Sequence, residues 1–346
     1  MIRPRLFVEA PAGLAAVSLR LQGGAHCRPP VSRLGSKQGY GGAILGALGL
    51  HSGQGADAYW WAEADADVRA LLACWPDPEA LAEVAAILRG WQAEEPRQLW
   101  TRLRDQRRAR GCREGAEALA EYVVIHQSNR LINVAGPDLV NTGKGGTTFG
   151  GGFAMPVSRL AERFEAAARA AYLLGGSYQF KGPDAGIGRP EGHPATGHTP
   201  TATLLPRTFG REAAAGRSWP PVHLSSDLPD AATLSAALGT PGDLECVVVY
   251  SDPPYEGTTG YGHELPRAVV LDLARGWASA GATVAISEAV PLDDALGGQW
   301  EAIEITGEGK VARGFSAQKR EWLTISKPPV GRPGVQLGIW GAACPA

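Results

Sequence analysis

The stretch that most constrains this chain is residues 247–255, which read Val-Val-Val-Tyr-Ser-Asp-Pro-Pro-Tyr. Three β-branched residues followed by a tyrosine predict a short buried strand. The strand must end at Pro253 and Pro254, because proline fixes φ and has no backbone N–H to donate to a sheet. Since open α/β sheets bind ligands just beyond the carboxyl ends of their strands, Asp252 and Tyr255 are predicted to lie in a ligand-binding site.

The chemistry of this turn suits one kind of ligand. The Asp252 carboxylate and the Pro253 carbonyl can accept hydrogen bonds from an exocyclic amino group, and the Tyr255 ring can stack on the planar base that carries it. An alternative interpretation is a proline turn that only terminates a buried strand.

Asp-Pro-Pro-Tyr after an apolar strand resembles the catalytic motif of amino-methyltransferases that act on nucleobases, above all adenine-N6 methyltransferases of the Dam type. The resemblance implies that Asp252, Pro253, Pro254 and Tyr255 are catalytic. It also implies S-adenosylmethionine (SAM) as cofactor, with Asp252 lying on the cofactor side as well. An aspartate in the first position favours adenine over cytosine-N4, where serine is usual in the resembling families.

Composition and charge limit the remaining classes. With 346 residues, 44% hydrophobic and 20% charged, the chain is expected to be a soluble globular protein. No apolar run approaches the roughly 20 residues that a membrane span needs. The five cysteines have no paired spacing, which predicts reduced thiols in a cytoplasmic protein without a zinc site. A net charge of −2 means that nucleic-acid binding would depend on local basic patches.

A second candidate region begins with the glycine-rich residues 31–42, continues through a short helix at 43–50, and ends in a strand at 58–65. Such a unit is typical of nucleoside cofactor sites, because glycines let the backbone approach the ligand. An acid at the end of the next strand accepts hydrogen bonds from the ribose hydroxyls. The residues predicted to bind the cofactor here are Gly35, Ser36, Lys37 and Glu63.

The same region resembles the start of Dam-type enzymes. Leu34-Gly35-Ser36-Lys37 stands where those enzymes have a Trp-Ala-Gly-Gly-Lys-like loop, which implies that Lys37 lies near the methionine end of SAM. The Glu-Pro-Phe-x-Gly-x-Gly loop that follows in the family is not visible between Lys37 and Glu63. Either the two loops are merged or the cofactor site is degraded. Residues 1–30 are weakly patterned and are interpreted as an edge strand or a tail.

The middle of the chain predicts helices and a nucleic-acid interface. Asp77 and Pro78 begin a helix that ends near Trp91, and a second helix from Pro96 carries seven arginines up to Arg113. These arginines, Arg107 and Arg108 among them, are predicted to contact phosphates, the alternative being a solvated face balanced by nearby acids. Further helices are expected at 114–127 and 158–174.

Residues 129–153 partly match a Dam-type segment that lies beside the catalytic pocket and the DNA. The match implies that Arg130, Asn133 and Lys144 bind nucleic acid, and a glycine-rich surface loop is the alternative. Residues 175–219 are interpreted as a long loop in the place of a target-recognition region. His193 and His198 within it have no carboxylate or cysteine partner at ligand spacing, so no metal is predicted.

The last third repeats the strand–helix alternation. A strand at 222–227 ends in Asp227, which the resemblance implies lies near the adenine of the cofactor. A helix at 231–238, the strand before Asp252, a helix at 265–280 and a strand at 283–287 follow. Two strands at 300–305 and 321–325 predict a closing antiparallel pair. From 228 to 327 the order of elements resembles the Dam-type family.

Together these features predict an α/β fold: a Rossmann-like SAM-dependent methyltransferase sheet with helices on both faces and an inserted recognition region. We expect the methyltransferase core at 1–75 and 221–346, and a helical, loop-rich insertion at 76–220. The predicted function is methyl transfer from SAM to the N6 amino group of a flipped adenine in duplex DNA. The alternatives are an RNA or cytosine-N4 methyltransferase, or an inactive nucleic-acid-binding relic of the fold.

Overall fold

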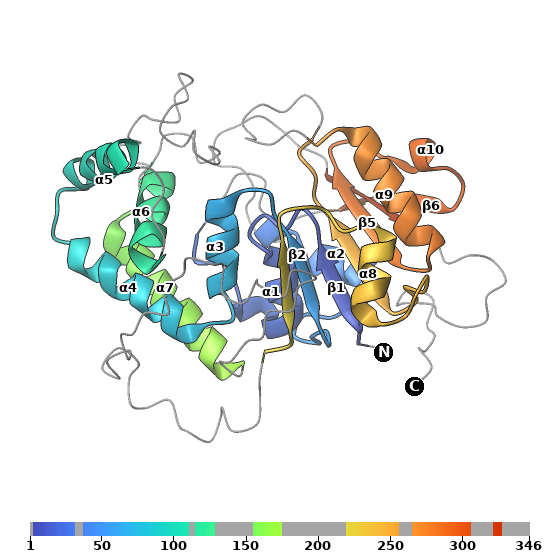
Figure 1. Cartoon of the computed structure of the whole chain (residues 1–346), viewed down its shortest axis with the longest axis horizontal. Coiled ribbons are helices and arrows are strands. Elements are labelled where there is room, and N and C mark those ends of the chain that lie inside the picture. The colour runs from blue at the N-terminus through green and yellow to red at the C-terminus, as the bar shows by residue number, and fades with distance from the viewer. Residues whose placement is uncertain are drawn as a thin grey trace.

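A single mixed sheet of seven strands organises the structure, a computed structural model that describes residues 3–31, 37–110, 115–128, 155–174, 219–255, 265–305 and 321–326 (Figure 1). The strand order is β3-β2-β1-β4-β5-β7-β6. All neighbouring strands are parallel except β7, which is antiparallel to both β5 and β6. The strands are β1 (Leu6–Glu9), β2 (Tyr59–Ala62), β3 (Val222–Ser225), β4 (Val247–Ser251), β5 (Thr283–Glu288), β6 (Trp300–Ile305) and β7 (Glu321–Ser326).

Strand β1 lies inside the sheet, between β2 and β4, so the interpretation of residues 1–30 as an edge strand or tail was wrong. Phe7 pairs with Tyr59 of β2 on one side and with Val248 of β4 on the other, both in parallel. All four residues of β1 are buried. A parallel strand that is covered on both faces is a short apolar run without alternation, and this is why four residues gave a weak sequence signal.

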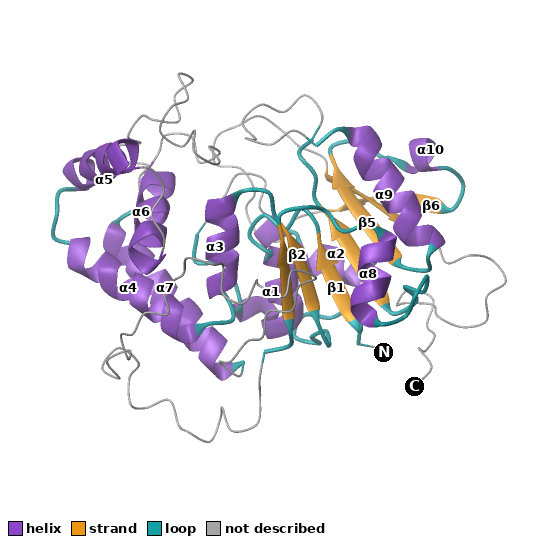
Figure 2. Cartoon of the chain, in the orientation of Figure 1, coloured by secondary structure: helices purple, strands orange, loops and turns teal. Residues whose placement is uncertain are grey.

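Helices cover both faces of the sheet, as predicted (Figure 2). On one face, the core around Phe7 and Trp61 includes side chains of α1 (Ala16–Gly23) and α2 (Gly41–Ala47). On the other face, a core around Val8 and Trp60 includes side chains of the helices that follow β3, β4 and β5. These helices are α8 (Ala231–Leu238), α9 (Arg267–Ser279) and α10 (Asp293–Leu296). The order β3-β2-β1-β4-β5 with helices on both faces is compatible with a doubly wound, Rossmann-like fold.

In the described residues between β2 and β3, five helices extend the molecule beyond the β3 edge of the sheet (Figure 1). Within this group, α4 and α7 pack closely along their length. The predicted start of α4 is confirmed, because the Asp77 carboxylate accepts hydrogen bonds from the amides of Glu79 and Ala80 and Pro78 is the first helical residue. The five helices are α3 (Ala66–Cys74), α4 (Pro78–Trp91), α5 (Pro96–Arg110), α6 (Gly115–Ser128) and α7 (Val157–Leu173). The short 3₁₀ helix η1 (Gly24–His26) directly follows α1, and η2 (Lys37–Gly39) precedes α2.

Candidate active site

Acidic residues line the edge of the sheet at which the parallel strands end. Each of the five parallel strands either ends in an acid or is followed by one within two residues: Glu9, Glu63, Asp227, Asp252 and Glu288. Because β7 runs antiparallel to its neighbours, its first residue, Glu321, lies at this same edge. The result is a negatively charged edge in the position where doubly wound sheets bind their ligands.

The loop between β1 and α1, residues 10–15, is fixed by two of these acids. Glu9 accepts hydrogen bonds from the amide and hydroxyl of Ser18, at 2.8 and 2.6 Å, so the end of β1 is tied to the first turn of α1. Glu63, after β2, accepts a hydrogen bond from the Gly13 amide at 2.9 Å. Gly13 has a φ of +53°, and a Cβ added to it would meet no atom within 4 Å. The loop thus combines an open backbone with the position in which doubly wound proteins bind nucleoside cofactors.

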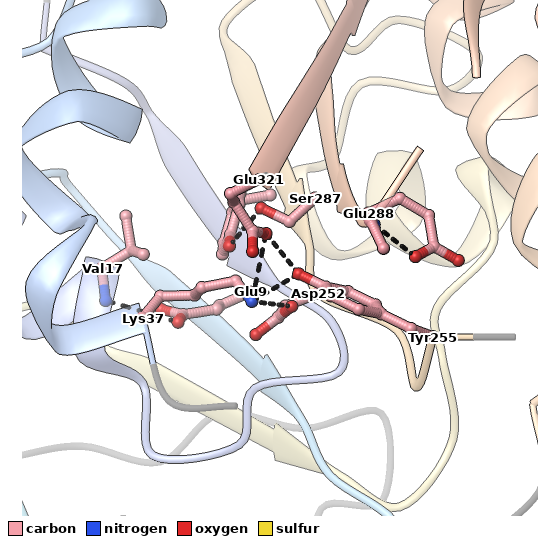
Figure 3. Close-up of polar contacts among 10 residues, drawn as sticks. Glu9, Val17, Lys37, Asp252, Tyr255, Ser287, Glu288 and Glu321 are labelled. Atoms are coloured by element: carbon pink, nitrogen blue, oxygen red, sulfur yellow. Dashed lines mark hydrogen bonds and ion pairs between the residues drawn. The ribbon is translucent and has the colours of Figure 1, made fainter. Parts of the chain in front are cut away.

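The side chains of three distant segments meet at the end of β4 (Figure 3). The Lys37 Nζ lies 2.9 Å from the Asp252 Oδ1 and 3.2 Å from the Glu321 Oε1. The same ammonium donates a hydrogen bond to the Tyr255 hydroxyl at 2.6 Å, and that hydroxyl donates to the Glu321 Oε1. Lys37 therefore contacts every polar member of the cluster, which we call the Lys37 cluster (Lys37, Asp252, Tyr255 and Glu321).

Burial sets the protonation of this cluster. The side chains of Lys37 and Glu321 are only 6% and 8% exposed, and that of Asp252 is 21% exposed. Burial alone would lower the pKa of Lys37, but the charges of Asp252 and Glu321 raise it by a larger amount. The net pKa of Lys37 is therefore raised, and the lysine keeps its proton. Burial raises the pKa of Asp252 to about 6, with Lys37 opposing the shift. Burial, together with Asp252 and Glu321, also raises the pKa of Tyr255, which remains a neutral hydrogen-bond donor.

Among the residues that the structure describes, acidic side chains outnumber basic ones around Asp252. Arg267 lies 2.8 Å from Glu288 and balances that acid, whereas Lys37 faces Asp252 and Glu321 together. Glu9 adds a further carboxyl whose pKa is raised to about 7, mainly because it is buried. A site of this kind favours a ligand that brings positive charge or hydrogen-bond donors.

Several residues predicted from the sequence meet at this edge. Lys37 lies against Asp252 and Tyr255, and Glu63 lies against the loop after β1. Pro253 is buried and Pro254 is partly buried at the turn after β4. Asp227 is exposed on the turn after β3, where its carboxylate accepts a hydrogen bond from the Ser226 hydroxyl at 3.1 Å. The predicted Gly35, Ser36, Arg130, Asn133 and Lys144 lie outside the described residues, as do His193 and His198.

Arg107 does not occupy the phosphate-facing position expected for it. Its side chain is 4% exposed and its Nη2 lies 2.5 Å from the Asp67 Oδ2, so the pair joins α5 to α3. Its guanidinium also lies 6.0 Å from the centre of the Tyr122 ring of α6. The sequence pattern of α5 does not distinguish an arginine that pairs inside the protein from one that faces solvent. The side chain of Arg108 lies outside the described set.

Neighbouring arginines of α5 are also paired within the chain. Arg102 lies 2.7 Å from Glu94, and Arg104 lies 2.8 Å from Asp105. This pairing fits the balanced helix face that was the alternative to phosphate contact.

Sequence reasoning missed two parts of the site, Glu9 with its loop and Glu321. For Glu9 a signal existed: an apolar run ends in an acid, a glycine follows four residues later, and an apolar helix comes next. For Glu321 no local signal existed, because it begins a strand and belongs to no motif. Its importance comes from the reversed direction of β7.

The structure is that of an α/β protein, compatible with a Rossmann-like fold, with a largely buried lysine–carboxylate–tyrosine cluster at the end of β4. No protein-family model matches the chain, and no curated protein matches it. Among the described residues, no group of three or more His, Cys, Asp or Glu side chains is arranged to hold a metal ion. No helix within the described ranges combines the length and apolarity that crossing a membrane requires.

Proposed function

We propose that this protein transfers a methyl group from SAM to the N6 amino group of adenine in DNA. The observation that carries the proposal is the juxtaposition of Asp252 and Tyr255, at the end of β4, with the charged Lys37 cluster. The adjacent strand β1 ends in the loop at 10–15, which is suited to a nucleoside cofactor. A base at the end of β4 and a cofactor at the end of β1 would be neighbours.

The loop after β1 also bears on whether the cofactor site is intact. Glu9 and Gly13 have the spacing of the Glu and first Gly in the Glu-Pro-Phe-x-Gly-x-Gly loop of Dam-type enzymes, although the Phe and second Gly have no counterpart and the loop precedes Lys37 instead of following it. A cofactor loop in this position is an alternative to a merged loop or a degraded site. This favours a working enzyme over a relic of the fold.

The charge of the site supports SAM in particular. When bound, SAM supplies an activated methyl group on a positively charged sulfonium. Two buried carboxylates, Asp252 and Glu321, share one lysine, so additional positive charge at this edge reduces their mutual repulsion. Among described residues, Glu63 is the acid positioned beside the loop after β1, and we assign to it the hydrogen bonds to ribose hydroxyls.

The residues after β4 would act by orientation and electrostatics. The lone pair of N6 is delocalised into the adenine ring, which makes N6 a poor nucleophile. Hydrogen bonds from N6 to the Asp252 carboxylate and the Pro253 carbonyl favour a tetrahedral nitrogen and aim its lone pair at the methyl group. The Asp252 carboxylate, with its pKa near 6, can also take up the proton that N6 loses.

The target adenine would have to leave the DNA helix to reach Asp252. Enzymes that modify a base inside a duplex flip it out of the stack. Tyr255 would hold the flipped base by stacking, which contributes roughly 1–3 kcal/mol per base.

The proposal is tested by incubating the purified protein with methyl-labelled SAM and unmethylated duplex DNA of mixed sequence, followed by digestion to nucleosides. Label in N6-methyladenine is the expected result. Label in N4-methylcytosine, or label only when RNA replaces DNA, would support the alternative substrates. A protein that transfers no label and binds no SAM would be a relic of the fold.

A further inference from the structure

Glu321 contacts both functional partners of Asp252 although it lies outside every motif of the chain. Its side chain is 8% exposed, and its Oε1 lies 3.2 Å from the Lys37 Nζ. The same oxygen accepts a hydrogen bond from the Tyr255 hydroxyl. It reaches the site because β7 is antiparallel and begins at the edge where β4 ends. A buried carboxylate that contacts the cation and the aromatic residue of the site has more than a packing role.

Lys37 occupies an acceptor that the proposed reaction requires. Its Nζ lies 2.9 Å from the Asp252 Oδ1, which is the kind of contact that the substrate amino group must make. Lys37 therefore competes with the amino group for Asp252. A lysine that leaves one buried carboxylate needs another anion nearby, because an unpaired buried charge is strongly unfavourable. Glu321 is already within ion-pair distance.

We propose that Glu321 is a positioning residue for the transfer: it holds the Lys37 ammonium and the Tyr255 hydroxyl, and it retains Lys37 when the substrate amino group displaces it from Asp252. This inference rests on the proposed function. The two acids then have different roles, since Asp252 contacts the substrate and Glu321 does not.

The variant Glu321→Gln isolates the charge of this residue. A glutamine oxygen can still accept the hydrogen bond from the Tyr255 hydroxyl, so the Tyr255 ring keeps its position. Lys37, however, keeps Asp252 as its only anionic partner in the cluster and competes harder with the substrate. We expect kcat/KM for DNA to fall at least tenfold, mainly through KM, while SAM binding changes less than threefold.

The pH dependence of the reaction gives a second readout. Asp252 is surrounded by charged or titratable groups from η2, β1, β4, β5, β7 and its own turn: Lys37, Glu9, Tyr250, Glu288, Glu321 and Tyr255. Among these, Lys37 lowers the pKa of Asp252, whereas Glu321 raises it. The acidic limb of the pH–rate profile should therefore move to lower pH in Glu321→Gln and to higher pH in Lys37→Met.

The experiment measures kcat, KM and the acidic limb for the full chain with duplex DNA. The variants are Glu321→Gln, Glu321→Asp, Lys37→Met and the double variant Glu321→Gln/Lys37→Met. Glu304→Gln is the control, because Glu304 is an exposed acid on the adjacent strand β6. We expect Glu321→Asp, which keeps the charge, to retain the wild-type acidic limb. Adding Glu321→Gln to Lys37→Met should lower kcat/KM by less than threefold, because the charge of Glu321 acts on the substrate through Lys37.

Two outcomes would overturn the inference. The first is that the wild-type protein methylates adenine but Glu321→Gln has the same kcat/KM and the same acidic limb as Glu304→Gln. The second is that the losses in kcat/KM of Glu321→Gln and Lys37→Met are fully additive in the double variant. A wild-type protein that transfers no methyl group at all would remove the proposed function, and this inference with it. Thermal unfolding of each variant separates a loss of fold from a loss of positioning.

Discussion

Asp252 is the residue on which the proposed chemistry depends most directly. Its carboxylate lies at the end of β4, is largely buried, and contacts Lys37 at 2.9 Å. Asparagine has nearly the same shape but cannot carry the charge or take up the proton from N6. A comparison of the two side chains at this position therefore separates shape from charge.

We predict that Asp252→Asn lowers kcat by about a hundredfold or more, the size of effect that follows loss of one buried electrostatic group in an active site. The wild-type rate should fall as pH decreases through about 6, because the carboxylate becomes protonated there. The variant should lack this acidic limb. Labelled-methyl kinetics from pH 5 to 8 check both points, with the exposed Asp272→Asn of α9 as the control. Near wild-type turnover in Asp252→Asn would contradict the assigned role.

At this scale the sequence predicted part of the site. Lys37, Asp252 and Tyr255 were each assigned to a site from their own segment, and in the structure they are in contact. Glu321 could not be predicted, because only the pairing direction of β7 shows that a residue beginning this strand reaches the end of β4. Arg107 was misassigned, since its buried partner Asp67 lies 40 positions away on another helix.

Among the elements, the junction of β1 and α1 depends on one buried acid. Glu9 is enclosed beneath the first turn of α1, and burial raises its pKa from 4.5 to about 7. Between these two values the folded state holds a proton that the unfolded state has lost. The contribution of Glu9 to stability is therefore fully present below pH 4.5 and is lost as pH rises through 7, which amounts to roughly 3 kcal/mol.

We predict that Glu9→Gln removes this contribution. A glutamine oxygen can accept the Ser18 hydrogen bonds without ionising. Between pH 5 and 8 the wild-type protein should lose on the order of 2–3 kcal/mol of unfolding free energy relative to the variant. Urea unfolding of both proteins at the two pH values measures this difference, and the other titrating groups cancel in the comparison. Parallel pH dependence of the two proteins would show that Glu9 ionises freely.

Arg107 links helix α5 to helix α3 through its ion pair with Asp67. Burial raises the pKa of Asp67, and Arg107 is the group that counteracts this effect. We predict that Arg107→Ala destabilises the protein by about 3 kcal/mol, because it leaves a buried carboxylate without its partner. Arg97→Ala, at an exposed position of the same helix, should change stability by less than about 0.5 kcal/mol. Equal stability of the two variants in urea unfolding would contradict the structural role of Arg107.

Most elements could be predicted because their boundaries are marked locally. The Asp77–Pro78 start of α4 and the proline stop after β4 are written in the residues themselves. Strand β1 was missed because four buried residues carry no periodicity, and helix α3 was not anticipated in the short interval between β2 and α4. Long elements with caps are therefore predictable, whereas short central ones depend on the neighbours that the sheet supplies.

For the whole molecule, the sheet order explains how distant segments form one site. Lys37 precedes β2, Asp252 follows β4 and Glu321 begins β7, yet all three meet at one edge. The net charge of −2 gives little general attraction to DNA. Arg102, Arg104 and Arg107 of α5 pair with acids of this chain, so DNA contact would have to depend on other local basic groups.

The central place of β1 has a consequence for how the protein is made. Leu6 leaves the ribosome about 240 residues before its partner Val247. At roughly 5–20 residues per second, β1 waits on the order of ten to fifty seconds for β4. Until then one side of β1 offers an unpaired hydrophobic strand, the kind of surface that chaperones bind and that aggregates recruit. We therefore expect translation speed and chaperone supply to govern the yield of native protein, with the final collapse of the sheet delayed until β4 is available.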